Sequence, residues 1–314
     1  MKWGIIGAGN IAKRFAQSQS HIENSCIYAI SARNHEKREI FKETYGVQHA
    51  YSAPLEVLED PQVEAVYIAL PHHMHYEWCK EAILHHKAVF VEKPACLHTQ
   101  EIEELLTLAK QEKVLFMEGM KSLLTPAYRA FKENDLNNIH SIEVQTGFVL
   151  PEKDRGYTTS KECGGCLYDM GIYALGLLSD LCKGDMHIDS LHTDLEHDVD
   201  FHDDIYMTIG NCKVHMVCSF KESLSKAVIH TDTQVYELYP IHRPLVCNGT
   251  EYPYVVDDFY GEIEHFLYLY NHNITESPIV TYISMYNHIH WMEEIHNMMK
   301  EVSIPFAESH FVRN

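Results

Sequence analysis

The sequence opens with an apolar stretch, Lys2–Ile6, that runs directly into a glycine-rich loop. The loop Gly7-Ala8-Gly9-Asn10-Ile11-Ala12 fits the pattern G-x-G-x-x-A, in which the glycines permit a tight turn and a close approach to a pyrophosphate. The helix that follows begins with free N–H groups and a positive dipole end, which suit phosphate. Because a strand precedes the loop and a helix follows it, we predict a dinucleotide site. A glycine-rich turn without a ligand is the alternative. The predicted contacts come from Gly7, Gly9, Asn10 and Ile11.

The first 120 residues alternate short apolar runs with helix-like segments that carry charges. We predict strands at Lys2–Ile6, Cys26–Ser31, Ala65–Leu70, Ala88–Val91 and Val114–Glu118. We predict helices between them at Ile11–Ser18, His35–Tyr45, Tyr76–His86 and Thr99–Lys113. Such alternation is typical of an α/β domain, with a parallel sheet and helices on both faces. Right-handed crossovers bring the carboxyl ends of the strands to one edge, where ligands bind. Residues 1–120 are therefore predicted to form a Rossmann NAD(P)-binding domain.

The pattern changes after about residue 120. Longer strands with few helices between them are predicted at Ser141–Phe148, Ile205–Ile209, Val214–Phe220 and Val228–His230, followed by a helix at Met285–Val302. This order indicates an α+β domain over residues 121–314, built on an open-faced, mostly antiparallel sheet. Its C-terminal helix can pack back on the first domain.

The end of the second predicted strand bears on the choice of cofactor. An NAD site usually places an acidic residue there to bind the ribose 2′-hydroxyl, but here Ser31 and Arg33 occupy these positions, with Lys37 and Arg38 one turn later. A hydroxyl and a guanidinium suit a 2′-phosphate better. We therefore favour NADP over NAD, the alternative being that these basic residues are a solvated start of a helix.

Composition excludes some partners. The formal net charge of −20 argues against general affinity for nucleic acid or an anionic membrane. The longest strongly apolar run, Met170–Leu178, is too short to span a bilayer, and glycines interrupt the N-terminal apolar stretch, so no signal peptide is expected. The 9 cysteines, an odd number without framework spacing, fit reduced thiols in a cytoplasm.

Two further blocks carry residues capable of proton chemistry. Glu92-Lys93-Pro94 follows a strand at the ligand-binding edge, where the lysine is either a surface charge or a donor aimed into the cleft. The block from Gly164 to Tyr173 is expected to open a helix, which would place Asp169 and Tyr173 at i and i+4 on one face. A carboxylate, a phenol and a lysine together make a plausible proton-handling set. A capped helix with a buried tyrosine is the alternative.

With these blocks in order, the sequence resembles the Gfo/Idh/MocA oxidoreductase family, in particular the subgroup of dimeric dihydrodiol dehydrogenase and glucose–fructose oxidoreductase. The resemblance rests on the opening residues 3–12, Pro71-His72-His73-Met74-His75, Glu92-Lys93-Pro94, Met117-Glu118-Gly119, the block 164–173 and Glu276-Ser277-Pro278. It implies a Rossmann domain followed by a substrate-binding domain whose open sheet forms a homodimer.

The resemblance also implies residue roles. Lys93 would hydrogen-bond the reacting oxygen of the substrate, Tyr173 would be the acid–base, and Asp169 would orient the substrate or the lysine. The subgroup often has a tryptophan and an arginine where this chain has Lys121 and Leu123. Those departures put the substrate more in doubt than the chemistry. The remaining cofactor contacts are expected from Leu70, His72, His75, Glu92, Lys93 and Arg38.

The chemistry follows from the residue types. Oxidation of an alcohol needs a base for the O–H proton while hydride passes to the nicotinamide. We expect the cation of Lys93 to lower the pKa of Tyr173 and to polarise a carbonyl in the reverse direction. The predicted function is an NADP-dependent oxidoreductase of a small hydroxylated substrate such as a sugar, polyol or diol. A non-catalytic dinucleotide-binding sensor is the alternative.

No metal site is predicted. Cys163-Gly164-Gly165-Cys166 could suggest redox or zinc chemistry, but a structural zinc needs four ligands and the sequence has no second C-x-x-C. The cluster His72-His73-Met74-His75 is more simply explained by cofactor contact or by a plain loop. His187, His192, His197 and His202 recur every five residues, which matches neither helix nor strand, and we treat them as incidental.

Overall fold

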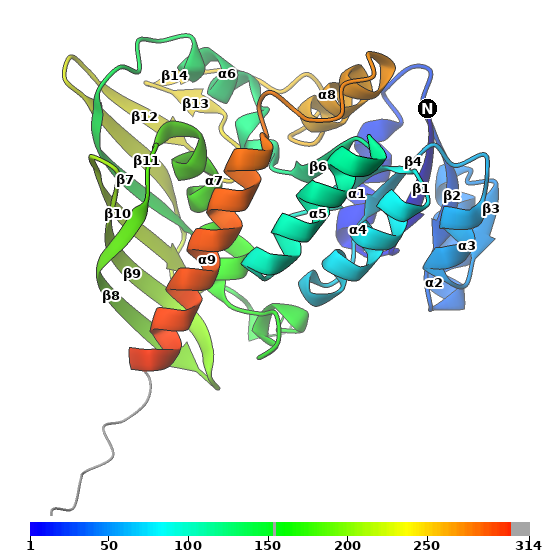
Figure 1. The fold of residues 1–314 in the computed structure, drawn as a ribbon, viewed down its shortest axis with the longest axis horizontal. Helices are drawn as coiled ribbons and strands as arrows, with labels where there is room; N and C mark the ends of the chain where they lie inside the picture. Colours follow the sequence, from blue (N-terminus) through cyan, green and yellow to red (C-terminus); the bar gives the residue numbers. More distant parts are fainter. Residues whose placement is uncertain (153–154, 303–314) are drawn as a thin grey trace, which may run out of the picture.

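The computed structural model of the chain describes residues 1–152 and 155–302, and it contains two sheets with a layer of helices between them (Figure 1). The smaller sheet and its helices form one half of the molecule, and the larger sheet forms the outer wall of the other half. Within the described ranges, no helix has both the length and the apolar character needed to cross a membrane.

The first sheet is parallel and has 6 strands in the order β3-β2-β1-β4-β5-β6. The order reverses beside β1, and this is the switch point where ligands bind in open α/β sheets. The strands are β1 (Lys2–Ile6), β2 (Cys26–Ser31), β3 (His49–Tyr51), β4 (Ala65–Ile68), β5 (Ala88–Glu92) and β6 (Phe116–Gly119). The helices are α1 (Asn10–Gln19), α2 (His35–Tyr45), α3 (Pro54–Glu59), α4 (His75–Leu84) and α5 (Thr99–Glu112), with a 3-10 turn η1 (His72–Met74). The predicted Rossmann architecture is confirmed.

The second sheet has 8 strands in the order β14-β13-β12-β11-β7-β10-β9-β8. Its pairs are antiparallel except β7 with β10, which run parallel at the centre of the sheet. The mostly antiparallel sheet is therefore confirmed, with four additional strands that the sequence analysis did not predict. The strands are β7 (Ile139–Gly147), β8 (Met186–Glu196), β9 (Val199–Ile209), β10 (Cys212–Ser219), β11 (Leu224–Thr231), β12 (Val235–Tyr239), β13 (Val246–Cys247) and β14 (Thr250–Glu251).

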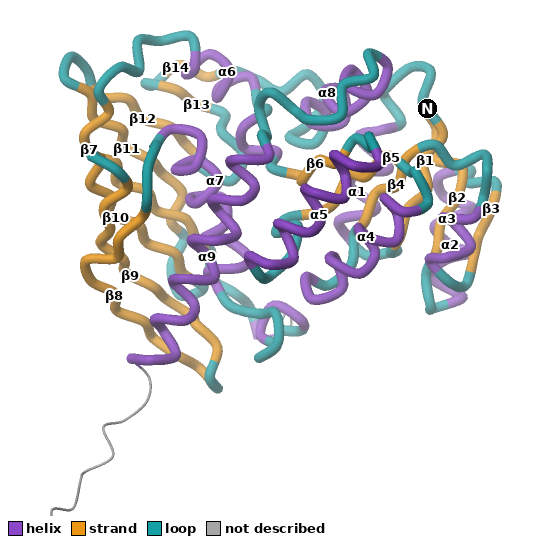
Figure 2. Tube along the Cα trace, in the orientation of Figure 1, coloured by secondary structure: helices purple, strands orange, loops and turns teal. Residues whose placement is uncertain are grey.

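Helices from the second half fill the space between the sheets (Figure 2). Helix α9 (Tyr282–Val302) packs against both α7 (Ile172–Leu181) and α5, and so joins the two halves. The other elements are α6 (Pro126–Lys132), α8 (Tyr260–Asn271) and the short turns η2 (Lys121–Leu123), η4 (Tyr157–Thr159) and η5 (Leu167–Gly171).

Aromatic packing ties α8 to the first sheet. Phe266 of α8 stacks on Phe90 of β5 with ring centroids 5.3 Å apart, and lies 5.1 Å from Trp3 of β1. All three side chains are fully buried. Buried aromatic rings contribute large apolar areas, so this cluster fixes α8 on the N-terminal half and brings the loop before α8 close to α1.

Candidate active site

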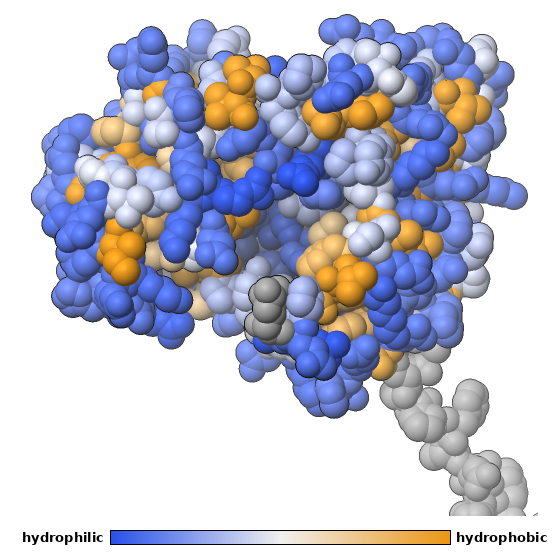
Figure 3. All heavy atoms as spheres, turned by 180° about the vertical axis from the view of Figure 1, so that it is seen from behind, coloured by the Kyte–Doolittle hydropathy of each residue, from blue (hydrophilic) through white to orange (hydrophobic). Residues whose placement is uncertain are grey.

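A groove of about 720 Å³ lies at the carboxyl edge of the first sheet. Seen from the side opposite to Figure 1, the surface is hollowed between the two halves of the molecule (Figure 3). The groove is lined by the glycine loop and α1, the ends of β2 and β4, and Tyr157 of η4. Of the residues predicted to bind cofactor, it contains Gly7, Gly9, Asn10, Ile11, Ser31, Arg33 and Leu70.

The glycine loop has the geometry that its pattern predicts. Gly7 has a positive φ of 112°, and a Cβ at this position would lie 2.2 Å from the carbonyl oxygen of Ala69, so no other residue fits. A Cβ on Gly9 would point into open space. Helix α1 begins at Asn10, immediately after Gly9, and its first N–H groups have no partner within the helix. An anion such as a pyrophosphate can therefore approach the backbone here.

The end of β2 offers the groups expected for the adenosine ribose. Ser31 is buried, and among the described residues its Oγ has no hydrogen-bond partner although it lies in the groove wall. Arg33 and Lys37 also line the groove. Arg38, in contrast, does not: its Nη1 donates to the carbonyl of Ala32 at 2.8 Å, so its guanidinium braces the β2–α2 turn. These residues fit a ribose that carries a phosphate.

Two of the three histidines that follow β4, His72 and His75, lie in different environments. His75 is fully buried, with Nδ1 2.7 Å from the carbonyl of Pro94 and Nε2 2.8 Å from that of Leu70. It therefore links the loops after β4 and β5 rather than facing the groove. His72 lies 3.1 Å from the carbonyl oxygen of Cys163 through Nδ1, and burial, followed by the charge of Lys93, lowers the pKa of His72 to about 3. A neutral His72 donates to that carbonyl, which leaves Nε2 as an acceptor.

Lys93, Asp169 and Tyr173 lie together, and none of them is among the residues that line the groove, so the predicted cofactor contact of Lys93 is not seen there. The Lys93 Nζ donates to the carboxylate Oδ1 of Asp169 at 2.9 Å and to its backbone carbonyl at 2.6 Å. The same ammonium lies 4.9 Å from the ring centroid of Tyr173. Burial opposes ionisation of Asp169, but the Lys93 charge outweighs it and lowers the pKa of this carboxyl. Lys93 thus favours the ionised form of Asp169.

The backbone before Tyr173 is not the regular helix that was expected. Residues Leu167–Gly171 form a π-helical turn, closed by a bond from the Ile172 N–H to the Leu167 carbonyl, and only then does α7 begin. A π turn inserts an extra residue into the helix and is frequent at functional sites. Within this turn, the backbone carbonyl of Asp169 accepts a hydrogen bond from Lys93.

The expectation that Lys93 would lower the pKa of Tyr173 was wrong for the protein without ligands. Burial, followed by the carboxylates of Glu92 and Asp169, raises the pKa of Tyr173 well above its ordinary value. The Lys93 charge is already neutralised by Asp169, so little of it acts on the phenol. Among the described residues the hydroxyl has no hydrogen-bond partner, and it stays protonated.

Several residues near the site were not recognised from sequence, or lie elsewhere than predicted. Glu92 is buried and accepts a hydrogen bond from Tyr67 beneath the site rather than lining the groove. Glu118, fully buried, accepts from the Ala95 N–H at 2.7 Å and bonds His288 of α9 at 2.5 Å. It therefore fixes the loop that carries Lys93. No sequence signal distinguishes these carboxylates, because their partners come from distant segments.

The two departures from the subgroup pattern are both buried. Lys121 pairs with Asp258 at 2.6 Å, and Asp258 also binds Arg14 of α1 at the groove. Leu123 is 2% exposed and belongs to the core. The ion pairs of Asp258 therefore connect the loop before α8 with both halves of the molecule.

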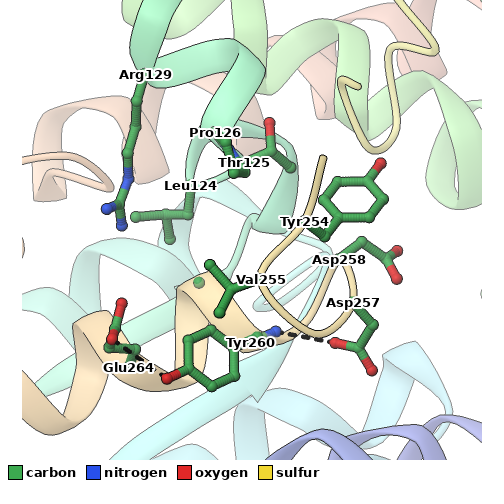
Figure 4. Close-up of a pocket in the computed structure, with 11 residues that line it drawn as sticks. Leu124, Thr125, Pro126, Arg129, Tyr254, Val255, Asp257, Asp258, Tyr260 and Glu264 are labelled. Carbon is green, nitrogen blue, oxygen red and sulfur yellow. Dashed lines mark hydrogen bonds between the residues drawn. The ribbon is translucent and has the colours of Figure 1, made fainter. Parts of the chain in front are cut away.

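A smaller pocket of about 120 Å³ lies beside the same loop, between α6 and α8 (Figure 4). Its wall includes Asp258, but also Arg129, Val255 and Glu264, which lie apart from the groove. Lys93, Asp169 and Tyr173 do not line it. They do not line the larger groove either, although His72 and Tyr157, whose rings pack 5.5 Å apart, connect its wall to Lys93 and Asp169.

Comparison with known proteins agrees with this geometry. Residues 1–120 match the GFO_IDH_MocA family model, described as an oxidoreductase family with an NAD-binding Rossmann fold. The trans-1,2-dihydrobenzene-1,2-diol dehydrogenase of Mus musculus is 31% identical over 57% of this chain and 55% of that protein. The scyllo-inositol 2-dehydrogenase (NADP(+)) IolU of Bacillus subtilis is 29% identical over 56% of each chain. The matched region thus spans little more than half the length of these relatives.

Solved structures match nearly the whole chain. The 3-ketoreductase KijD10 from Actinomadura kijaniata, in complex with NADP and TDP-benzene, superposes with a TM-score of 0.83 at 19% identity, covering 95% of this chain and 97% of that one. The aldose-aldose oxidoreductase from Caulobacter crescentus gives 0.84 at 17% identity over 96% and 98%. At these identities the likeness establishes the fold.

Proposed function

We propose that the protein is a member of the oxidoreductase family whose model residues 1–120 match, and that it transfers hydride between NADP and a small hydroxylated substrate such as a sugar, polyol or diol. The observation that carries the proposal is the set formed by Lys93, Asp169 and Tyr173. Core packing alone does not explain it, since a buried lysine costs free energy unless it is paired.

NADP is the proposed cofactor, with NAD the less favoured one. The unpartnered hydroxyl of Ser31 and the guanidinium of Arg33 support NADP, since both groups suit a 2′-phosphate. The IolU relative is named for NADP(+), and KijD10 was solved with NADP. The proposed pyrophosphate contacts are the N–H groups that follow Gly9.

When bound, the cofactor supplies or accepts the hydride. In reduction, the protonated hydroxyl of Tyr173 donates its proton to the substrate oxygen, while Lys93 donates a hydrogen bond to that oxygen. Asp169 binds the Lys93 ammonium at 2.9 Å and fixes its position. In oxidation the phenol must first lose its proton to solvent so that the phenolate oxygen can take the substrate proton, and forming that phenolate needs an additional positive charge nearby because the pKa of Tyr173 is raised.

The environment of Tyr173 favours a polar substrate. The ring of His242 lies 6.1 Å from that of Tyr173, and burial followed by the charge of Lys121 lowers the pKa of His242 to about 4. A neutral imidazole can both accept and donate hydrogen bonds to hydroxyl groups. The named substrates of the relatives, a diol and an inositol, share vicinal hydroxyls.

A non-catalytic sensor is the second candidate, favoured by Lys121, which departs from the subgroup pattern and is held in an ion pair with Asp258. A panel of substrates separates the enzyme from the sensor. Purified protein is mixed with NADP⁺ or NAD⁺ and a series of sugars, diols and inositols, and reduction of the cofactor is followed by absorbance. The enzyme account predicts turnover on at least one member with NADP⁺. Cofactor binding without turnover in either direction would favour the sensor.

We further propose that residues 1–120 and 121–314 act as a cofactor-binding domain and a substrate-binding, dimerisation domain, and that the protein is a homodimer. Helices cover one face of the larger sheet, and among the described residues the other face is uncovered. Outward residues there are mostly polar, with Tyr206 half exposed and stacked on His215 at 4.2 Å.

All nine cysteines are free thiols, which supports a cytoplasmic location.

Light scattering tests the dimer. We expect about twice the chain mass of 36.3 kDa, and we expect Tyr206→Glu to give the monomer mass. Tyr268→Glu, a similarly exposed tyrosine on α8, serves as the control and should remain dimeric. A parent protein that is monomeric at micromolar concentration would refute the proposal.

A further inference from the structure

A buried cluster of two thiols and a carboxylate lies outside the groove. Cys166, which precedes the π turn η5, meets Cys218 of β10 with their Sγ atoms 3.7 Å apart. Each sulfur lies 3.3 Å from Oδ2 of Asp203 on β9. All three side chains are 0% exposed. The residues come from three separate segments, so sequence spacing could not have indicated the cluster.

The C-x-x-C pair that stood out in the sequence is not the pair that the fold brings together. Cys163 turns away from Cys166, and its Sγ lies 3.3 Å from Nδ1 of His73. Cys166 meets Cys218 instead. The C-x-x-C motif offers too few ligands for a structural zinc. That argument does not apply to Cys166 and Cys218, which form a different pair.

The separations suit a tetrahedral zinc ion. With Zn–S of about 2.3 Å and Zn–O of about 2.0 Å, a tetrahedron holds two sulfurs roughly 3.8 Å apart and a sulfur and an oxygen roughly 3.5 Å apart. The observed separations of 3.7, 3.3 and 3.3 Å require shifts of only a few tenths of an ångström. These three atoms can therefore become ligands without rearrangement of the backbone.

A second observation also points to a missing ligand. The other oxygen of Asp203, Oδ1, is buried and makes no hydrogen bond of good geometry among the described residues; the nearby Thr193 hydroxyl only lowers the pKa of this carboxyl and is itself left without a well-formed bond. A buried carboxylate oxygen left in this state is costly. Zinc bound by two sulfurs and one or both carboxylate oxygens would remove that cost and approach the usual coordination number.

We propose that Cys166, Cys218 and Asp203 bind one structural zinc ion, with both oxygens of Asp203 or a water completing the coordination. The ion displaces the protons that the two thiols donate to Asp203 in the metal-free protein, so each zinc bound releases them to solvent. It joins β9 and β10 to the residue before η5. The ion would thereby hold the π turn that carries Asp169.

Protonation of the ligands makes zinc uptake dependent on pH. Zinc binds thiolates and a carboxylate, so the protons on these ligands must leave before the ion can bind. Zinc must compete with these protons, so the apparent affinity should rise as the pH rises.

The test measures metal content and ligand type in the full chain. The protein is unfolded, stripped with chelator, refolded under reducing conditions with zinc, desalted, and analysed by mass spectrometry of its metals. The proposal predicts about one zinc per chain, and a cobalt-refolded sample should show thiolate-to-cobalt charge-transfer absorption. X-ray absorption on the zinc form should count two sulfur neighbours.

Variants locate the ligands. Cys218→Ser and Asp203→Asn should reduce zinc to the background level. Cys212→Ser is the matched control, because Cys212 also contacts a second cysteine, Cys182, and should leave zinc unchanged. A refolded parent with no zinc and no cobalt–thiolate band, zinc retained in both ligand variants, or a Cys166–Cys218 disulfide formed in place of metal binding would each overturn the proposal. The cobalt spectrum of the parent protein shows whether thiolates bind the metal, even if a variant fails to fold.

Discussion

The hydroxyl of Ser31 and the guanidinium of Arg33, which line the groove together with Lys37, are the groups that we propose to discriminate between the cofactors. Ser31 is fixed by burial within the strand, whereas Arg33 is exposed and free to reach a phosphate at the groove. Arg38 is occupied by the Ala32 carbonyl. The preference for NADP should therefore depend mainly on Arg33.

We expect Arg33→Ala to weaken NADP binding by roughly ten- to a hundredfold, because a charged hydrogen bond contributes about 1.5–3 kcal/mol. The affinity for NAD should change little. Fluorescence titration with both cofactors measures the two constants. Lys13→Ala, which removes an exposed cation from α1 outside the groove, controls for net charge. Equal losses for NADP and NAD would contradict the assignment of Arg33.

At this scale the sequence predicts which residues stand at the edge of the sheet, because motif and strand order determine that. It does not predict their partners. Arg38 and Glu92 were expected in the groove, yet both are held by buried contacts with Ala32 and Tyr67. The pKa of Tyr173 was misjudged for the same reason, since it depends on Glu92 and on burial.

Strand β6 contributes a buried carboxylate that links two distant segments. Its Glu118 joins the loop after β5 to α9 through the Ala95 N–H and His288. Because the loop carries Lys93, this carboxylate acts as a positioning residue. It sets where the Lys93 ammonium stands relative to the π turn, although it does not touch the groove.

We expect Glu118→Ala to lower the free energy of unfolding by about 1–3 kcal/mol for each of the two buried groups that it leaves without a partner. Urea denaturation measures the change. Glu104→Ala removes an exposed carboxylate that binds Lys80 and Tyr76, and should have a much smaller effect because exposed ion pairs contribute little. Similar losses in the two variants would show that Glu118 has no special role.

The elements were predictable to different degrees. The alternation of apolar runs and helical segments predicts the Rossmann half, since buried parallel strands are nearly continuous apolar runs. Strand β8 was missed because it is partly exposed along its whole length and its residues do not alternate cleanly. The π turn at Leu167–Gly171 leaves no pattern in the sequence, because packing against β10 and the Lys93 bond select it.

As a whole, the molecule buries several histidines in neutral form. Burial lowers the pKa of His72 to about 3 and those of His242 and His265 to about 4, in each case as the largest cause. In the unfolded chain the same groups titrate near their ordinary value of about 6.5. At a pH between the pKa of a histidine in the folded protein and its pKa in the unfolded chain, the unfolded state binds more protons than the folded state.

The free energy of unfolding should therefore be retained above about pH 6.5 and fall as the pH drops toward 4, by up to about 1.4 kcal/mol per pH unit for each histidine. Thermal unfolding between about pH 7.5 and 4.5, roughly the range in which these histidines titrate, measures how the free energy of unfolding changes with pH. His265→Gln, which can keep a bond to Ser277 and lies away from Lys93, should reduce this dependence on pH. A slope that is unchanged in this variant would refute the contribution of His265.

In the proposed mechanism Tyr173 carries the proton while Lys93 binds the reacting oxygen. The most direct measurement is the turnover of Tyr173→Phe, on the best substrate of the panel, alongside its NADP affinity. The phenylalanine keeps the buried ring and removes only the hydroxyl. We predict an intact fold, nearly unchanged NADP binding, and kcat lowered by ~10²–10⁴, the usual contribution of general acid–base catalysis. Turnover equal to that of the parent protein would contradict the account.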